Sequence, residues 1–331
     1  MKAVVSPKLK STSRKSRNNV LRRRLLIAGL AAFLLFDVAL VSFALTGTNP
    51  SESADSVVDA PEVEPVETTP AVAAPAETSE PAETTAITSP PPTRILTALD
   101  ASSVWRATTG DCPAATANPE LTTDGGETWS AFDASDGTDA SSILSIDITS
   151  KSEATLVTLT ASDCTPQRVT TFVAGAQWQE YPDRVGANWY VDPTDRAAVH
   201  GPTGTFPAPC TSVIALAPRT DSTAAVLCSD GTLFRTDDGA ATFGRGIALP
   251  GAANLAFSDD GYVIVATNQA GCAGIQLLAT PEELNGMLTP SGCREMAVTS
   301  GDLAVAIADG ILWLWAGDEM VKSSDGGTTW Q

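Results

Sequence analysis

The sequence has very little histidine: His200 is the only one in 331 residues. Its six cysteines contain no Cys-x-x-Cys pair, so a zinc site has almost no ligands to draw on. Tyrosine is also scarce, with three residues in the chain. The sequence therefore predicts no metal site and no cofactor.

Positive charge is scarce beyond the N-terminus. Residues 1–24 contain nine Lys and Arg and no acid, so the other 11 basic residues face all 39 acidic ones. A surface this negative repels nucleic acid and anionic lipid. The main body of the chain is therefore not expected to bind DNA or RNA.

The sequence has one long apolar run. Residues 25–45, LLIAGLAAFLLFDVALVSFAL, contain a single charge, Asp37, and are long enough to cross a bilayer. The basic residues before the run and the acidic ones after it predict a cytoplasmic N-terminus and an extracellular body. We therefore expect a single-pass anchor in the cell membrane. A cleaved signal peptide, with Ser42 and Ala44 near the cut, is the alternative.

Residues 46–93 contain nine acids, no base and no aromatic residue, and they are rich in Pro, Ala and Thr. Such a composition cannot form a core, so it predicts a disordered linker. The predicted organisation is a cytoplasmic tail (1–24), an anchor (25–45), a linker (46–93) and an exported domain (94–331).

The exported domain lacks any convincing helical period. Its apolar runs are four to seven residues long and are separated by turns, among them Asp230-Gly231, Asp260-Gly261 and Asp309-Gly310. Asp-Gly between apolar runs is a strong hairpin signal. Residues 94–331 are therefore predicted to be all-β.

An eight-residue pattern occurs three times in this domain. The copies, which we call repeats 1, 2 and 3, are TTDGGETW (122–129), TDDGAATF (236–243) and SSDGGTTW (323–330). Each has Ser or Thr first, Asp third, Gly fourth, Thr seventh and an aromatic residue eighth. A worn repeat, TFVAGAQW (171–178), has Val173 in place of the Asp.

This pattern resembles the Asp-box, or BNR, repeat of sialidase-like β-propellers, whose motif is Ser-x-Asp-x-Gly-x-Thr-Trp. In that family the box lies between the third and fourth strands of a blade, where its polar side chains satisfy the turn and its aromatic residue packs between sheets. The resemblance implies a structural role for Thr122, Asp124, Gly126, Thr128, Trp129, Thr236, Asp238, Gly239, Thr242, Phe243, Ser323, Asp325, Gly327, Thr329 and Trp330. Repeat 2 departs from the motif at Ala240, where Gly is expected in the fifth position.

The spacing of the copies predicts the number of blades. Third positions fall at 124, 173, 238 and 325, and repeats of 40–50 residues indicate a propeller. The last interval is about two periods, which leaves a blade without a repeat at roughly 252–292. We predict about five blades. Six is the alternative, if NWYVDPTDRAAVHGPTG (188–204) hides a degenerate blade.

Many Asp-box proteins are sialidases, so a sialidase-like exo-glycosidase is one candidate function. Such a site needs an arginine triad, a Tyr–Glu pair and an acid/base Asp. The family's Phe/Tyr-Arg-Ile-Pro signature is missing, and neighbouring Glu180 and Tyr181 would face opposite ways on a strand. The sequence favours a non-catalytic, membrane-anchored binding or scaffold module with a protein or glycan partner at a propeller face.

All six cysteines lie in the exported domain and predict disulfides. Nearly equal hairpin arms and bracketed turns favour two of the pairs, and the third remains to join the first two blades. The expected pairs are Cys210–Cys228, Cys272–Cys293 and Cys112–Cys164.

Repeat 3 is followed by Gln331 alone, where a fourth strand is expected. We predict that Arg94–Leu99, RILTAL, pairs beside the last strand as the outermost strand of the final blade. The ring would then be closed by its two ends.

Overall fold

The structure is a computed structural model that describes residues 88–331. The predicted tail, the predicted anchor at 25–45 and nearly all of the predicted linker lie outside the described residues. Among residues 88–331, no helix combines the length and the apolar character needed to span a membrane.

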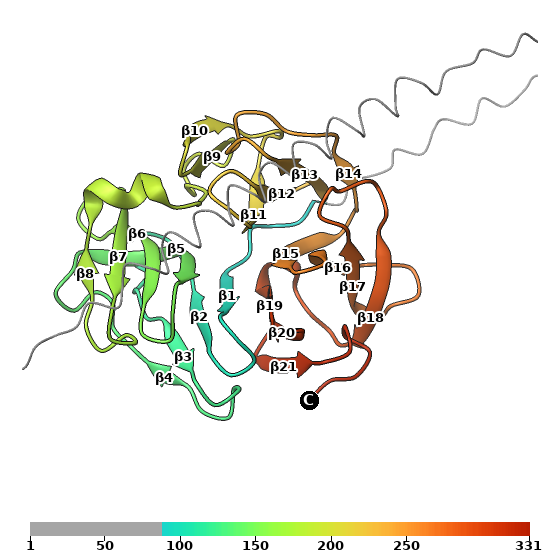
Figure 1. The fold of residues 1–331 in the computed structure, drawn as a ribbon, viewed down its shortest axis with the longest axis horizontal. Helices are drawn as coiled ribbons and strands as arrows, with labels where there is room; N and C mark the ends of the chain where they lie inside the picture. Colours follow the sequence, from blue (N-terminus) through green and yellow to red (C-terminus); the bar gives the residue numbers. More distant parts are fainter. Residues whose placement is uncertain (1–87) are drawn as a thin grey trace, which may run out of the picture. The chain divides into compact units, whose positions relative to one another are not determined.

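Five antiparallel sheets of three or four strands surround a common centre, with β1, β5, β11, β15 and β19 innermost (Figure 1). In each sheet consecutive strands pair, so each is a meander. The prediction of an all-β, five-bladed propeller is confirmed.

The blades follow one another along the chain. Blade 1 contains β1 (Arg94–Ala98), β2 (Val104–Thr108), β3 (Glu120–Thr122) and β4 (Ser130–Ala131). Blade 2 contains β5 (Ala140–Ile148), β6 (Ala154–Thr160), β7 (Pro166–Thr171) and β8 (Gln179–Glu180). Blade 3 contains β11 (Val213–Pro218), β12 (Ala224–Cys228), β13 (Thr232–Thr236) and β14 (Ile247–Ala248). Blade 4 contains β15 (Ala252–Ser258), β16 (Gly261–Thr267), β17 (Gly274–Thr280) and β18 (Thr289–Glu295). Blade 5 contains β19 (Leu303–Ala308), β20 (Ile311–Ala316) and β21 (Glu319–Ser323), preceded by the 3-10 helix η2 (Ser300–Asp302).

A short hairpin between blades 2 and 3 accounts for the long interval in the repeat spacing. It consists of β9 (Ala198–Gly201) and β10 (Gly204–Pro207) and follows the 3-10 helix η1 (Pro182–Ala187). Trp189 donates its indole N–H to the carbonyl of Thr220 at 2.9 Å, which ties the segment to blade 3. Two strands docked on a neighbouring blade do not make a sixth one.

Apolar side chains fill the space between neighbouring blades at four of the five junctions of the ring. Trp105 and Ile143 pack between blades 1 and 2, and Leu96 and Trp313 pack between blades 5 and 1. Similar clusters lie between blades 3 and 4 and between blades 4 and 5. At these four junctions the blades are therefore held together by side-chain burial rather than by backbone pairing.

The predicted closure of the ring is wrong. β1 pairs with β2 as the innermost strand of blade 1 and not beside the last strand. The N–H of Leu99 donates to the carbonyl of Ser103 at 2.9 Å, and Asp100 accepts from the N–H of Ser102 at 2.8 Å. This short turn makes β2 a local partner, and local pairing costs much less chain entropy than pairing across the whole domain.

Blades 5 and 1 meet instead through side chains and loops, along a junction that we call the seam. Lys322 donates from Nζ to the carbonyl of Gly125 at 3.0 Å, and the guanidinium of Arg94 lies 4.4 Å from the centre of the Trp315 ring. Gln331 and Lys322 exchange two backbone hydrogen bonds, of 2.9 and 3.1 Å, beside β21. The seam is therefore sealed without a shared strand.

Three disulfides stabilise the ring, and they are the pairs expected from the sequence. Cys112–Cys164 joins the β2–β3 loop of blade 1 to the β6–β7 loop of blade 2. The other two, Cys210–Cys228 and Cys272–Cys293, lie within blades 3 and 4.

Replacing Cys112 and Cys164 together by serine is expected to lower the free energy of unfolding by about 4 kcal/mol, because the bridge spans 52 residues. The matched pair Cys210→Ser and Cys228→Ser opens a bridge of only 18 residues and is expected to cost about 3 kcal/mol. Chemical denaturation of the compact unit 80–331 measures both. A smaller loss for the blade-joining pair than for the matched pair would contradict this expectation.

Candidate binding surface

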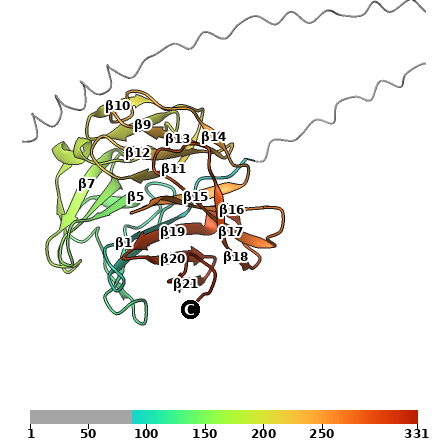
Figure 2. The ribbon, with the colours of Figure 1, turned by 45° about the vertical axis from the view of Figure 1, so that its right-hand side comes forward.

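The ring has two ends that differ in chemistry. The strands of each blade are antiparallel, so the loop between the second and third strands and the connection to the next blade lie at one end of the ring. The turns between the first and second strands and between the third and fourth strands lie at the opposite end. The three disulfides lie at or next to the first end, which we call the disulfide end. Repeats 1–3 lie at the other, the repeat end. Figure 2 shows the ring turned from the axial view, with blades 4 and 5 forward.

Each repeat begins at the last residue of a third strand: Thr122 of β3, Thr236 of β13 and Ser323 of β21. In repeat 3, Asp325 accepts hydrogen bonds from the N–H of Thr329 at 2.8 Å and from its hydroxyl at 2.7 Å. The hydroxyl of Ser323 donates to Asp325 and accepts from the N–H of the fifth residue. Repeats 1 and 2 make the same four bonds.

These bonds keep the three carboxylates ionised. The hydroxyl of Thr128 lowers the pKa of Asp124 to about 2, and the N–H of Thr329 lowers the pKa of Asp325 to about 2. The pKa of Asp238 is lowered in the same way. In all three repeats the carboxylate is therefore occupied by hydrogen bonds from its own turn.

Acidification is expected to weaken the domain through these turns. The folded pKa values of Asp124 and Asp325 lie near 2, below the ordinary 3.8. Their stabilising effect is therefore complete above pH 3.8 and is lost as the pH falls toward 2. Thermal unfolding of residues 80–331 across this range should show a falling midpoint, and the Asp124→Asn, Asp325→Asn double variant should show a flatter profile. Parallel profiles would contradict the assignment.

The eighth-position aromatic residues pack at the edges of the blades. The Arg106 guanidinium lies 4.0 Å from the centre of the Trp129 ring, and that of Arg294 lies 5.8 Å from the Trp330 ring. Phe243 packs against the apolar cluster between blade 3 and the β9–β10 hairpin. All three residues contribute to packing between sheets.

The two blades without the repeat's Asp expose apolar side chains in the corresponding turns. The worn repeat keeps its shape, since the N–H of Gly175 donates to the hydroxyl of Thr171 at 2.9 Å. Its outward positions carry Phe172 and Val173, which are 53% and 49% exposed, and the turn of blade 4 carries Met287, 59% exposed. These are the large exposed apolar residues of the part of the chain that the structure describes, and all lie at the repeat end.

Two arginines converge on one glutamate between blades 3 and 4. Glu282 contacts both Arg219 and Arg235, and Tyr262 lies beside them. Tyr262 is only 1% exposed, and burial raises the pKa of its hydroxyl. A tyrosine nucleophile needs access to substrate and a lowered pKa. The cluster joins two blades, and its tyrosine is buried rather than open to a substrate.

His200 is part of the packing of the β9–β10 hairpin. Its ring stacks on Tyr190 with centroids 4.3 Å apart, and its Nδ1 lies 2.9 Å from the hydroxyl of Thr205. Burial lowers the pKa of His200. Residues 88–331 contain no group of three side chains suited to hold a metal ion.

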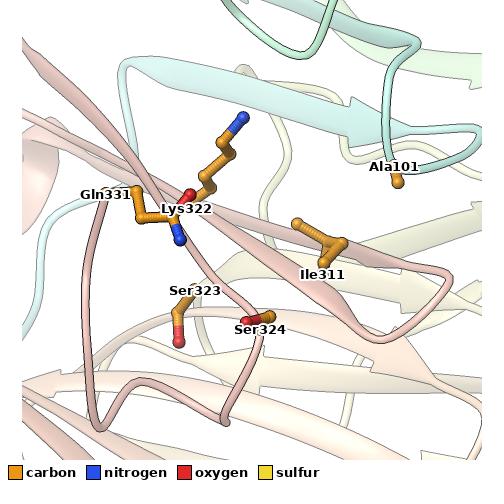
Figure 3. A pocket seen from close by; sticks show the side chains of 6 residues that line it. All are labelled: Ala101, Ile311, Lys322, Ser323, Ser324 and Gln331. Carbon is orange, nitrogen blue, oxygen red and sulfur yellow. The ribbon is translucent and has the colours of Figure 1, made fainter.

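A hollow of about 230 Å³ lies at the repeat end of the seam (Figure 3). It is lined by Ala101, Ile311, Lys322, Ser323, Ser324 and Gln331. Lys322 has the one charged side chain of these six residues, and its ammonium already donates to the carbonyl of Gly125. The hollow supplies no catalytic set.

The disulfide end gathers negative charge. Four of the five blades carry an exposed aspartate on the loop between their second and third strands: Asp111, Asp163, Asp230 and Asp318. None of the four forms an ion pair within residues 88–331. Beside Asp111 the β2–β3 loop surrounds an open hollow of about 400 Å³.

Three arginines at this end have partners of their own and do not neutralise those loops. Arg196 donates to the carbonyl of Val213 at 3.1 Å, and Arg294 pairs with Glu319 at 2.6 Å. Arg94 lies over the Trp315 ring in the seam. Sequence reasoning missed this charged surface, although Gly-Asp or Ser-Asp recurs at each of the four loops.

No family model matches the chain, and no curated protein matches it. Among solved structures it is similar to YCF48 bound to D1 peptide, with 17% identity, a TM-score of 0.30 and coverage of 74% of this chain and 82% of that one. It is also similar to YCF48 from Cyanidioschyzon merolae, with 14% identity, a TM-score of 0.29 and coverage of 74% and 86%. With TM-scores this low, neither likeness carries a conclusion about function.

Proposed function

We propose that the chain is a membrane-anchored Asp-box propeller, displayed outside the cell, which binds a protein partner through the disulfide end of its ring. Residues 25–45 form the anchor with the N-terminus in the cytoplasm, and the linker presents the propeller. Three disulfides within the domain are consistent with an oxidising, extracellular location.

One observation carries the proposal. The exposed carboxylates of Asp111, Asp163, Asp230 and Asp318 lie on loops at one end of a rigid ring, without ion-pair partners in the described part of the chain. Loops held by a rigid scaffold are where binding residues concentrate. Uncompensated charge of one sign steers and selects a partner of the opposite sign.

Site-specific crosslinking in the cells that make the protein tests this function. A photoreactive amino acid at Asp318, at the disulfide end, is expected to give one discrete protein adduct of the full chain. The same residue at Asp309, in the β19–β20 turn at the repeat end, is the matched control and should give none. Absence of an adduct at both positions would refute the binding function.

The alternative function, an exo-glycosidase, draws its support from the convergence of Arg219 and Arg235 on Glu282. The burial of Tyr262 argues against it. We expect the full chain to release no fluorophore from sialosides or other common glycosides above the buffer control. Release that is abolished by Glu282→Gln would establish the enzyme instead.

A further inference from the structure

Six residues that precede β1 run across the disulfide end of the ring. We call residues 88–93, with sequence TSPPPT, the proline strap. The N–H of Ser89 donates to the carbonyl of Ser229 in blade 3 at 2.7 Å, and the N–H of Thr93 donates to the carbonyl of Gly301, just before blade 5, at 2.8 Å. Blades 3 and 5 are not neighbours, so the strap is a chord over the end of the ring. Figure 1 shows this blue-green stretch leaving β1 toward blade 3.

The strap lies in a track shaped for an extended proline-containing chain. Ser89 is buried, and Pro91 and Pro92 are half-buried. Gly301 lies against the strap, since a Cβ added there would be 3.4 Å from Cγ of Pro90. Prolines have fixed φ and no N–H, so such a segment loses little entropy on docking and leaves no backbone donor unpaired.

The charge of the track does not match its occupant. The strap has no charged group, yet carboxylates flank it. Asp302 accepts from the hydroxyl of Thr93 at 3.1 Å, and Asp230 follows the Ser229 that accepts from Ser89. Asp318 adjoins Gly317, whose N–H donates to the Asp302 carbonyl at 3.1 Å. A peptide of the same backbone shape with Lys or Arg side chains would gain attraction that the strap lacks.

We propose that the disulfide end is a docking track for an extended, proline-containing basic peptide, and that the strap covers this track in cis. The inference rests on the proposed binding function and adds the chemistry of the partner. It also makes binding conditional on displacement of the strap, which an incoming peptide must outcompete.

A locked strap tests the inference in the full chain. Pro90→Cys with Gly301→Cys is designed to fix the strap through a disulfide, because a Cβ added at position 301 would lie 3.4 Å from Cγ of Pro90. Pro90→Ser with Gly301→Ser is the matched unlocked control, and cooperative thermal unfolding of both, with a midpoint of the locked chain no lower than that of the control, shows that both are folded. The probe is a fluorescein-labelled peptide of repeated Lys-Pro-Pro, titrated by anisotropy, with Glu-Pro-Pro and Lys-Ser-Ser peptides as charge and shape controls.

The unlocked control is expected to bind Lys-Pro-Pro about tenfold more tightly than the locked chain, and more tightly than it binds either control peptide. Asp230→Asn with Asp318→Asn should weaken binding and reduce its salt dependence. Thr93→Val, which removes the hydroxyl that donates to the Gly301 carbonyl and the Asp302 carboxylate, should tighten binding by about threefold.

Equal affinities of the locked and unlocked chains would overturn the role of the strap. Lys-Pro-Pro binding no tighter than Glu-Pro-Pro would overturn the charge assignment. If either result were found together with a cellular adduct at Asp318, the proposed binding function would stand without the role of the strap or the charge assignment. If neither an adduct nor peptide binding were found, the binding function and the docking track would both be refuted.

Discussion

Replacing Trp313 with alanine is expected to lower the free energy of unfolding by about 3–5 kcal/mol. Trp313 lies in β20 and is 1% exposed. Its ring faces blade 1, where a Cβ added to Gly126 would be 3.0 Å from it. Alanine would leave a cavity in the seam, where blades 5 and 1 meet without a shared strand.

Chemical denaturation of residues 80–331 measures this loss, with Trp105→Ala as the matched control. Trp105 is 2% exposed between blades 1 and 2, which the chain and a disulfide already join. Both variants should lose stability, but Trp313→Ala alone should speed amide hydrogen exchange in β1 and β21 together. A loss below about 1 kcal/mol for Trp313→Ala would show that the seam is not closed by this packing.

Short-range signals made the blades predictable. Asp230-Gly231, Asp260-Gly261 and Asp309-Gly310 all lie in hairpin turns, between β12 and β13, β15 and β16, and β19 and β20. Gly231 and Gly310 have φ values of 78° and 72°, which residues with a side chain rarely adopt. Each turn is specified by the residues within it, so the sequence is sufficient to identify it.

Partners distant in sequence were not predictable in the same way. The strand at 94–98 has the same apolar pattern whether it lies inside blade 1 or outside blade 5, and the local turn at Asp100 decides between the two. Residues 88–93 have the composition of the linker, yet Thr93 bonds to Gly301, 208 positions away. The conformation of residues 88–93 depends on bonds to distant residues of the ring, and the neighbouring sequence contains no sign of them.

The surface chemistry was predictable in part. The Asp of each repeat was assigned a structural role, and in the structure it accepts hydrogen bonds within its own turn. The acidic surface at the disulfide end was not predicted, because acidic residues are distributed along the whole domain sequence. Only the topology brings Asp111, Asp163, Asp230 and Asp318 to one end of the ring.

Replacing Gly327 with alanine is expected to cost about 2–5 kcal/mol, the sum of a left-handed backbone penalty and overpacking. Gly327 has φ of 91°, and a Cβ there would overlap Cδ1 of Leu277 in blade 4. Ala240 occupies the same fifth position in repeat 2 with φ of 75° and is fully buried, so the turn itself accepts a methyl group. The expected damage in repeat 3 therefore comes mainly from the neighbouring blade.

Gly326→Ala separates the two contributions. Gly326 has φ of 71°, but its nearest neighbour to an added Cβ is Ser291 at 3.9 Å, so this variant should lose only the backbone penalty of about 1–2 kcal/mol. Denaturation of residues 80–331 with each variant, and with Gly327→Ala in a Leu277→Ala background, completes a double-mutant cycle. A coupling of at least about 1 kcal/mol between positions 327 and 277 is expected, because the smaller side chain makes room for the methyl group. Equal losses at 326 and 327 with no coupling would mean that repeat 3 shapes its own turn without setting the distance between blades.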